Sequence, residues 1–329
     1  YDQVNNVILP MAVPLLLFSA NLRVVFKSTG RLIPLFALGS IGTVLGGILG
    51  FLIVPLKSLE LEAWKVCAAL TARHIGGAVN YVAVANVLNV SPKVLGAGLA
   101  ADNLFNVLYF ALLFYLARDA EYVSDETSMM SNSSSSSSKI EIKEDSSGKG
   151  FSTYKASSAI AFSAILCYVS KSLSVLINGS QSLTIPIATI FSVLIATTFP
   201  KQCKDVAQSA EALAALAMNA FFATVGASGS ISDMLSTAPS LFFFSATQVL
   251  THLAFLLLAA KLLKFRRSEA LIASNANVGG PTTAAAMAAS LKWSSLVVPG
   301  MLVGVLGYAI ATFIGIAFGE LILKRMILS

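Results

Sequence analysis

The chain has 329 residues, of which 56% are apolar and only 12% are charged, and its net charge is +6. Soluble domains carry about 25% charged residues, so the composition excludes a soluble enzyme and a nucleic-acid-binding protein. It predicts an integral membrane protein surrounded by a lipid bilayer. The three cysteines have neither metal-ligand nor disulfide spacing, so we expect no metal site, no cofactor and no catalytic residues.

Ten hydrophobic segments follow one another along the chain, and most are long enough to cross about 30 Å of hydrocarbon as helices. They cover residues 4–26, 32–54, 60–90, 93–117, 156–177, 183–199, 207–227, 240–264, 268–290 and 295–323. This pattern predicts an all-α membrane protein, a polytopic helical bundle.

Residues 118–155 interrupt the hydrophobic pattern. They include SNSSSSSSKIEIKEDSSGKG, which has too few large apolar side chains to fold by burial. We expect a disordered serine-rich linker between a first transmembrane repeat, residues 1–117, and a second transmembrane repeat, residues 156–329.

An internal repeat supports this division. IGGAVNYVAVANVLNVSPKVLGAG (75–98) aligns without a gap with VGGPTTAAAMAASLKWSSLVVPGM (278–301), at an offset of 203 residues. Paired glycines weaken a helix, and broken helices in matching positions of two halves indicate the binding site of a secondary transporter. The repeat predicts two discontinuous, crossing helices, non-helical at 75–80 and 278–283, whose breaks face each other near the molecular centre.

The relative orientation of the two halves depends on the number of membrane crossings. Six crossings between matching segments make parallel halves, whereas failure of segment 5 or 6 to span makes inverted repeats. Fifteen basic residues divide 12 to 3 between the two faces in the inverted scheme and 10 to 5 in the parallel one. The division favours inverted repeats, with the loops at 23–31 and 261–267 on one face. It also assigns Lys93, Lys324 and Arg325 to that face and Lys292 to the opposite one.

Asp102 is the best candidate for a functional ionisable residue. It lies about 13 Å into segment 4 at 1.5 Å per residue, where an unpaired charge is costly. With Asn103 it forms a candidate cation-binding pair for Na⁺ or H⁺, and the alternative is that Asp102 only neutralises Arg73. The residue that matches Asp102 in the second repeat is Val305, so the halves differ chemically.

Candidate substrate-binding groups surround both predicted breaks. Arg73 could hold an anionic group, and His74 is either a proton relay or a hydrogen-bonded core residue. Uncharged polar groups and the glycines complete the set. The polar groups suit either a substrate-binding site or hydrogen bonds between helices. The full candidate set is Arg73, His74, Gly76, Gly77, Asn80, Asn275, Asn277, Gly279, Gly280, Thr282 and Thr283.

A remote alternative is an intramembrane serine protease. Residues 226–229 read GASG, and His252 lies one segment later. A Ser228–His252 dyad needs hydrogen-bond contact. However, Ser228 is near a segment end and His252 is about 18 Å into the next segment.

The combined motifs resemble those of the YjcL-like membrane proteins, a family of unknown function. The motifs are LPMAVPLLLFSANLR, FALGSIGTVLGGILGF, IGGAVNYVAVANVL, AADN, ATTFPK, FFATVGAS and NVGGPTTAAAMA. The resemblance places the chain in the cation:proton antiporter and anion transporter superfamily. It implies inverted repeats and a core domain that moves against a panel domain. In the antiporter branch an acidic or Asn-Asp pair follows the first broken helix, where this chain has Asp102-Asn103 in reversed order.

The resemblance and the repeat together predict a secondary active transporter that moves a small organic anion, coupled to Na⁺ or H⁺. The alternative is a monovalent cation/proton antiporter. The serine-rich insertion resembles plant members, which implies a plastid membrane, and family members have further hydrophobic sequence before the position of Tyr1. The oligomeric state is left open, with a homodimer as one option.

Overall fold

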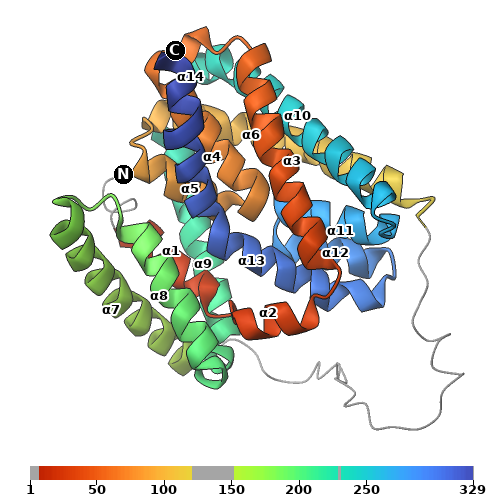
Figure 1. The fold of residues 1–329 in the computed structure, drawn as a ribbon. Helices are drawn as coiled ribbons and strands as arrows, with labels where there is room; N and C mark the ends of the chain where they lie inside the picture. The colour runs from red at the N-terminus through yellow and green to blue at the C-terminus, as the bar shows by residue number, and fades with distance from the viewer. Residues whose placement is uncertain (1–6, 121–151, 229–230, 329) are drawn as a thin grey trace, which may run out of the picture.

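The computed structural model describes residues 7–120, 152–228 and 231–328, and this part of the chain contains helices and no strands (Figure 1). Six of these helices are long and apolar enough to span a membrane, or seven if the bent pair α1–α2 is one span. An all-α polytopic membrane protein is therefore confirmed. Most of the predicted serine-rich linker lies outside the described residues.

The helices follow the predicted segments closely. In chain order they are α1 Leu9–Leu17, α2 Leu22–Ser28, α3 Leu32–Ile53, α4 Ala63–Gly76, α5 Ala78–Val87, α6 Pro92–Ala117, α7 Thr153–Asn178, α8 Thr184–Thr198, α9 Pro200–Ser228, α10 Ile231–Leu262, α11 Arg267–Val278, α12 Pro281–Ser290, α13 Ser294–Phe318 and α14 Lys324–Leu328. A 3-10 turn, Lys57–Glu62, precedes α4, and a π turn, Gly319–Leu323, precedes α14. Helices α1 and α2 are bent by 49° at their junction.

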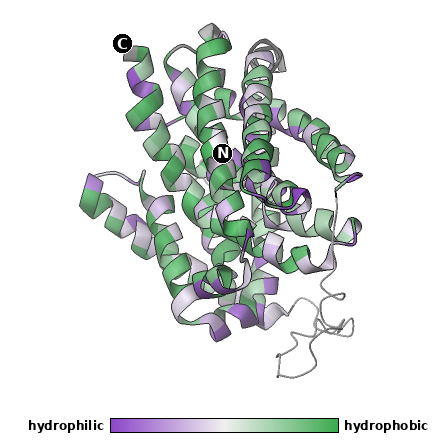
Figure 2. Cartoon of the chain, turned by 45° about the vertical axis from the view of Figure 1, so that its right-hand side comes forward, coloured by the Kyte–Doolittle hydropathy of each residue, from purple (hydrophilic) through white to green (hydrophobic). Residues whose placement is uncertain are grey.

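The outer surface of the bundle is apolar. Large hydrophobic side chains such as Leu52, Val107, Tyr168 and Leu176 are exposed, and hydrophilic residues gather toward the helix ends and turns (Figure 2). Exposed apolar surface on this scale would promote aggregation in water, whereas lipid tails cover it in a bilayer. The surface therefore agrees with the predicted membrane location.

The helices form two groups. Helices α1, α7, α8 and α9 make a peripheral group, which packs through small side chains that include Ala159, Ala196, Ala210 and Ala214. In Figure 1 α7 and α8 lie at the left of the molecule. The other long helices make a central group, and the sequence repeat with its glycine pairs belongs to it.

Helices α3 and α10 are the tightest pair in the central group, and they run antiparallel. Gly39 faces His252, Gly46 faces Gln248 and Gly50 faces Phe244, so residue numbers rise along one helix as they fall along the other. A Cβ atom on Gly46 would collide with the carbonyl oxygen of Gln248. Small residues let helix backbones approach closely in membranes, so the glycine seam of α3 holds this pair together.

Helices α4 and α5 form a hairpin, here called the first hairpin. A Cβ atom on Gly315 of α13 would lie 2.7 Å from Ala72 Cβ and 3.0 Å from Val84 Cγ2. Twelve residues of continuous helix would separate Ala72 and Val84 by about 18 Å. At the base of the hairpin, Glu62 accepts hydrogen bonds from the Ser91 amide at 2.8 Å and the Ser91 hydroxyl at 2.6 Å. The chain therefore returns to the end at which it entered.

Helices α11 and α12 form the second hairpin in the same way. Asn275 Nδ2 donates to Met287 Sδ at 3.1 Å across the two legs. Gly300 of α13 packs against both Ile272 and Ala284. Helix α13 thus lies along the second hairpin with its first half and along the first hairpin with its second half.

The two hairpins have matching backbones. Gly77 has φ 85° and ψ −176°, and Gly280 has φ 89° and ψ −170°. At the ends of the hairpins, Asn89 and Lys292 have φ values of 53° and 59°. Both pairs are separated by the 203 residues of the sequence repeat, so the internal repeat is also a repeat of backbone conformation.

The predicted discontinuities are confirmed, but their extent differs from the prediction. Helix geometry is lost only at Gly77 in the first hairpin and at Gly279 and Gly280 in the second, whereas we expected breaks at 75–80 and 278–283. A glycine with positive φ and extended ψ reverses the chain within about one residue. A long unwound stretch is therefore unnecessary, and segments 3 and 9 turn back instead of crossing.

The hairpins project from opposite ends of the bundle. Arg31 donates to the Lys264 carbonyl at 3.1 Å and lies 3.4 Å from Glu269, at the base of the second hairpin. This end, the Arg31 face, unites the loops at 23–31 and 261–267 as predicted. The opposite end, the Glu62 face, holds the base of the first hairpin and Lys324, whose ammonium lies 5.4 Å from the ring of Trp64.

The predicted division of positive charge is wrong for four residues. Lys93 follows Ser91 at the Glu62 face, and Lys324 and Arg325 lie at that face too, whereas Lys292 lies near the Arg31 face. The prediction treated segments 3 and 9 as crossings. Because each is a hairpin, every residue between it and the next crossing changes face.

Candidate functional site

The tips of the two hairpins meet at Tyr308, in the middle of α13. A Cβ atom on Gly77 would lie 3.2 Å from Tyr308 Cε1, and one on Gly280 would lie 3.3 Å from Tyr308 Oη. The prediction that the two breaks come together near the molecular centre is therefore confirmed. Tyr308 itself was not predicted, because one tyrosine in an apolar segment has no distinguishing pattern.

Helices α5 and α12 both begin at this meeting point. The first amides of a helix have no partner within it, and they carry partial positive charge. The carbonyl ends of α4 and α11 are capped instead. Asn80 Nδ2 donates to the Gly76 carbonyl at 2.6 Å, and the amides of Gly279 and Gly280 donate to the Asn275 carbonyl at 2.7 Å and 3.2 Å. The junction of the tips therefore favours negative charge.

Neutral polar groups line the same junction. Asn80 Oδ1 accepts from Thr312 Oγ1 at 2.7 Å, and Thr283 Oγ1 donates to the Gly280 carbonyl at 3.1 Å. Thr282, another predicted site residue, is exposed instead. Thr312 was not among the predicted site residues.

Two separate cavities lie between this junction and the Glu62 face. A small one lies between Asn80, Tyr308 and Thr312 of the central group and Ile185 and Thr189 of α8. A larger one of about 570 Å³ is lined by the end of the first hairpin, the turn between α7 and α8, and Lys171. Ile185 lines both cavities. Both cavities lie between the peripheral and the central groups.

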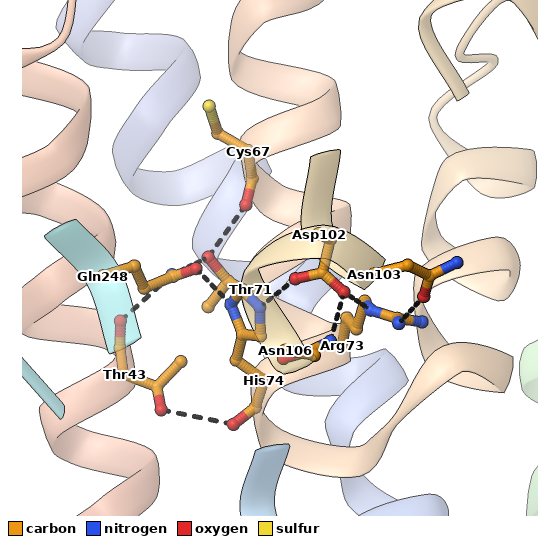
Figure 3. A network of polar contacts seen from close by, with 9 residues as sticks. All are labelled: Thr43, Cys67, Thr71, Arg73, His74, Asp102, Asn103, Asn106 and Gln248. Atoms are coloured by element: carbon orange, nitrogen blue, oxygen red, sulfur yellow. Dashed lines mark hydrogen bonds and ion pairs between the residues drawn. The ribbon is translucent and has the colours of Figure 1, made fainter. Parts of the chain in front are cut away.

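Asp102 lies on the other side of the first hairpin, where it is fully buried at the centre of a polar network that extends to the exposed Asn103 (Figure 3). Asp102 Oδ2 accepts from Arg73 Nε and from Asn106 Nδ2, the latter at 2.7 Å. Asp102 Oδ1 lies 2.5 Å from His74 Nε2. Arg73 also donates from Nη2 to Asn103 Oδ1 at 2.7 Å. The four predicted residues 73, 74, 102 and 103 therefore form one cluster.

The donors around Asp102 do not suit a Na⁺ site. A metal cation needs oxygen atoms that turn lone pairs toward it, yet Arg73, Asn106 and His74 present hydrogens or a ring nitrogen to both carboxylate oxygens. The guanidinium of Arg73 would also repel a cation at this distance. The geometry fits the predicted alternative in which Asp102 neutralises Arg73.

The network continues from His74 to helices α10 and α3. His74 Nδ1 lies 2.7 Å from Gln248 Oε1, and Gln248 Nε2 donates to Thr71 Oγ1 at 2.7 Å and to the Thr43 carbonyl at 3.2 Å. Thr43 Oγ1 contacts the His74 carbonyl at 3.3 Å. Sequence reasoning missed Thr43, Thr71 and Gln248, because a single polar residue in a membrane helix does not reveal which neighbour it faces.

A second buried histidine, His252 of α10, lies beside the second hairpin. Its Nε2 lies 2.8 Å from Ser274 Oγ, and its Nδ1 lies 2.9 Å from Thr43 Oγ1 and 2.7 Å from the Gly39 carbonyl. Both ring nitrogens are engaged by α3 and α11. The protease alternative needs His252 beside Ser228, and this arrangement argues against it.

The remaining predicted residues, Asn275 and Asn277, bind within the second hairpin and to α3. Asn277 Nδ2 donates to Ser40 Oγ at 3.1 Å. The side-chain oxygens of both asparagines are buried and have no hydrogen-bond partner. Among the described residues, no group of three or more His, Cys, Asp or Glu side chains could hold a metal ion.

The fold and this site define a class of protein: a polytopic α-helical membrane protein in which two hairpins from opposite ends meet at the centre. Comparison with known proteins identifies the family. Residues 1–326 match the family model described as "Protein of unknown function (DUF819)", so the chain belongs to that family. It is 34% identical over 332 residues to the "Uncharacterized membrane protein YjcL" of Bacillus subtilis (strain 168). The alignment covers 97% of this chain and 83% of the relative.

Proposed function

We propose that this protein is a secondary active transporter that carries a small organic anion, with transport coupled to Na⁺ or H⁺. The observation that carries the proposal is the meeting of the two hairpin tips at Tyr308. Two helix N-termini directed at one point form a ready-made anion site. In secondary transporters, short helices broken near the midplane place their N-termini on anionic substrate groups.

The arrangement of the halves supports alternating access. The hairpins share a backbone repeat but project from opposite faces, and α3 and α10, which occupy matching places in the two halves, are antiparallel. Both features are expected of inverted repeats related by an axis in the membrane plane. The two cavities lie between the helix groups, where one group would move against the other. These features, together with the family resemblance, support placement in the cation:proton antiporter and anion transporter superfamily.

An anion would approach from the Glu62 face and pass Lys171 first. It would then reach Asn80, Thr312 and Tyr308 between the hairpin tips. The side chains that line the inner cavity are neutral, so the helix N-termini provide the attraction for the anion. They act against the carboxyl group of Glu211 on α9, which interacts electrostatically with Tyr308. The serine-rich stretch, with the resemblance to plant members, supports a plastid membrane as the location.

Uptake into proteoliposomes tests the proposal. The purified full chain would be supplied with ¹⁴C-labelled pyruvate, succinate or citrate under an imposed Na⁺ or pH gradient. We expect gradient-driven accumulation of at least one class of carboxylate, and a large loss of it in Asn80→Ala and Thr312→Val. Gly226→Ala is the control, because Gly226 lies within helix α9 and a Cβ atom there meets no atom within 4 Å.

The alternative is a monovalent cation/proton antiporter, and the buried contact between Asp102 and His74, a pair that can exchange a proton, favours it. Proton flux driven by Na⁺ or K⁺ without any organic solute, measured with a pH-sensitive dye inside the same vesicles, would support the antiporter. No carboxylate uptake under either gradient would contradict anion transport.

A further inference from the structure

The hydrogen-bond directions around Gln248 fix the orientation of its amide (Figure 3). Gln248 Nε2 faces the Thr43 carbonyl oxygen, which only accepts. It also faces Thr71 Oγ1, whose own hydrogen is donated to the Cys67 carbonyl at 2.8 Å. Both neighbours of Nε2 must therefore accept, and Oε1 must be the atom that faces His74.

The orientation of Gln248 determines the state of His74. Because Oε1 only accepts, His74 Nδ1 must carry a hydrogen in order to bond to it at 2.7 Å. The other ring nitrogen, Nε2, lies 2.5 Å from Asp102 Oδ1. A neutral imidazole with its hydrogen on Nδ1 would direct a lone pair from Nε2 at a carboxylate oxygen.

The contact between His74 and Asp102 is compatible only with one further hydrogen between them. Asp102 Oδ2 already accepts from Arg73 and Asn106, so this hydrogen lies on Oδ1 or on Nε2. We propose that His74 and Asp102 share one exchangeable proton, and that this proton is the coupling ion of the transport cycle. The second part rests on the transport function proposed above; the first part does not.

The charge count shows what the proton does. With the proton bound, Arg73, His74 and Asp102 together carry one positive charge, and without it they are neutral. On loading, an N–H or O–H bond forms with a proton from water, and on release the same bond breaks and the proton returns to water on the other side. Na⁺ is not an equivalent ion, because Asp102 is surrounded by donors.

Other titratable groups near this pair come from several helices. Arg73 and Cys67 lie on α4, Tyr81 on α5 and Tyr109 on α6, while His252 of α10 interacts electrostatically with His74. The facing residue of α3 is Thr43, which does not titrate at ordinary pH. Arg73 is the only permanent charge in this set, and its bond to Asp102 is present with or without the proton.

Loss of the proton must break one link of the first hairpin. If His74 keeps its hydrogen on Nδ1, the lone pair on Nε2 repels the carboxylate oxygen of Asp102 on α6. If the hydrogen moves to Nε2, the hydrogen bond from Nδ1 to Gln248 of α10 is lost. In either case α4 is less firmly held to its neighbours. Proton release and movement of the first hairpin are thereby linked, which is the requirement for coupling.

The protein has only two histidines, so ¹⁵N NMR of imidazole-labelled full chain in lipid nanodiscs tests the proton directly. At neutral pH we expect both His74 nitrogens to be bonded to hydrogen or to share one, with a pH-dependent shift. In Asp102→Asn, His74 should become an ordinary neutral ring with its hydrogen on Nδ1. His252→Gln assigns the signals and should leave those of His74 in place.

A free lone pair on His74 Nε2 in the wild-type protein at neutral pH would overturn the shared proton. Because Asp102→Asn leaves Arg73 without its partner, the wild-type pH titration provides the same test if that variant does not fold. For coupling, carboxylate uptake should follow a pH gradient in the wild type and lose that dependence in His74→Gln. Uptake driven only by Na⁺ would overturn the coupling role while leaving anion transport intact. Absence of any uptake would overturn the transport function, with the NMR result unaffected.

Discussion

The two hairpins have the same backbone and different chemistry. In the first hairpin, Arg73 and His74 precede the glycine pair and bond to Asp102 of α6. In the second hairpin, Ala276 and Asn277 occupy the matching positions, and Val305 of α13 replaces Asp102. A repeated fold therefore supplies two equivalent tips, whereas the ionisable groups next to the glycine pair, Arg73 and His74 with their partner Asp102, belong to the first half alone.

This difference suggests a division of roles. Both tips direct a helix N-terminus to the common point at Tyr308, so both contribute to an anion site. Under the proposed function, only the first hairpin would bind and release the coupling proton, through His74 of its buried leg. The second hairpin is held by the neutral contacts of Asn277 and Ser274 with α3 and α10, so no charge change is needed for it to keep its place.

The largest expected effect is that of Asp102→Asn. The substitution leaves Arg73 buried without a counter-charge, and breaking a buried ion pair costs about 3–5 kcal/mol. The melting temperature of the purified protein measures the loss. Asp119→Asn, the same change at an exposed residue just beyond the end of α6, is the control. The double variant Asp102→Asn with Arg73→Gln should recover most of the lost stability; if it is no more stable than the single variant, the ion pair is not the cause.

Alanine at the hairpin tips has the next largest effect. Gly77 and Gly280 combine positive φ with extended ψ, a region essentially restricted to glycine, where another residue costs about 1–3 kcal/mol. A Cβ atom would also press on Tyr308. Both variants should lose stability and transport. Gly179→Ala, with φ 64° and no atom within 4 Å of its Cβ, should lose some stability and keep transport. Equal transport in all three variants would show that the tips do not contact substrate.

The two buried histidines provide a matched pair. Replacement of either leaves buried partners unsatisfied, at a cost of about 1–3 kcal/mol, so His74→Gln and His252→Gln should have similar effects on the melting temperature. Only His74→Gln should abolish the pH dependence of uptake, because His252 bonds to neutral groups. A loss of pH dependence in His252→Gln alone would reverse the roles of the two halves.

The smallest effects are expected at the hairpin bases. Glu62→Gln loses charge-assisted bonds to Ser91, which should cost about 1 kcal/mol. Arg31→Gln removes an ion-pair partner of Glu269. Because the Arg31 side chain is 53% exposed, the loss of stability should lie below about 1 kcal/mol. Thermal unfolding at low and high salt measures both. A larger, salt-sensitive loss in Arg31→Gln would show that the second base is the stronger anchor.

The sequence was most informative where a pattern repeats. The glycine pairs at an offset of 203 residues predicted both breaks and their meeting, because only glycine suits the backbone reversal at Gly77 and Gly280. The depth of Asp102 in an apolar segment predicted that it is either functional or the partner of Arg73, and the contact with Arg73 is present. Its contact with His74 was not predicted. These signals depend on residue type and spacing along the chain.

Other features depend on tertiary contacts. A helix that bends back and a helix that continues have the same apolar composition, so the hairpins were predicted as crossings and four basic residues were assigned to the wrong face. Tyr308, Gln248 and Thr43 acquire their roles only when α13, α10 and α3 pack against the hairpins. Nothing in the local sequence of these three residues distinguishes them from ordinary polar residues of a membrane helix.

The most direct test of the opposed hairpins is sided cysteine labelling. Lys93 and Ser295 lie in the first turns of the helices that follow the two hairpins, α6 and α13. In oriented vesicles, with the native cysteines replaced, a membrane-impermeant maleimide should label Lys93→Cys from one side and Ser295→Cys only from the other. Labelling of both positions from the same side would contradict the account.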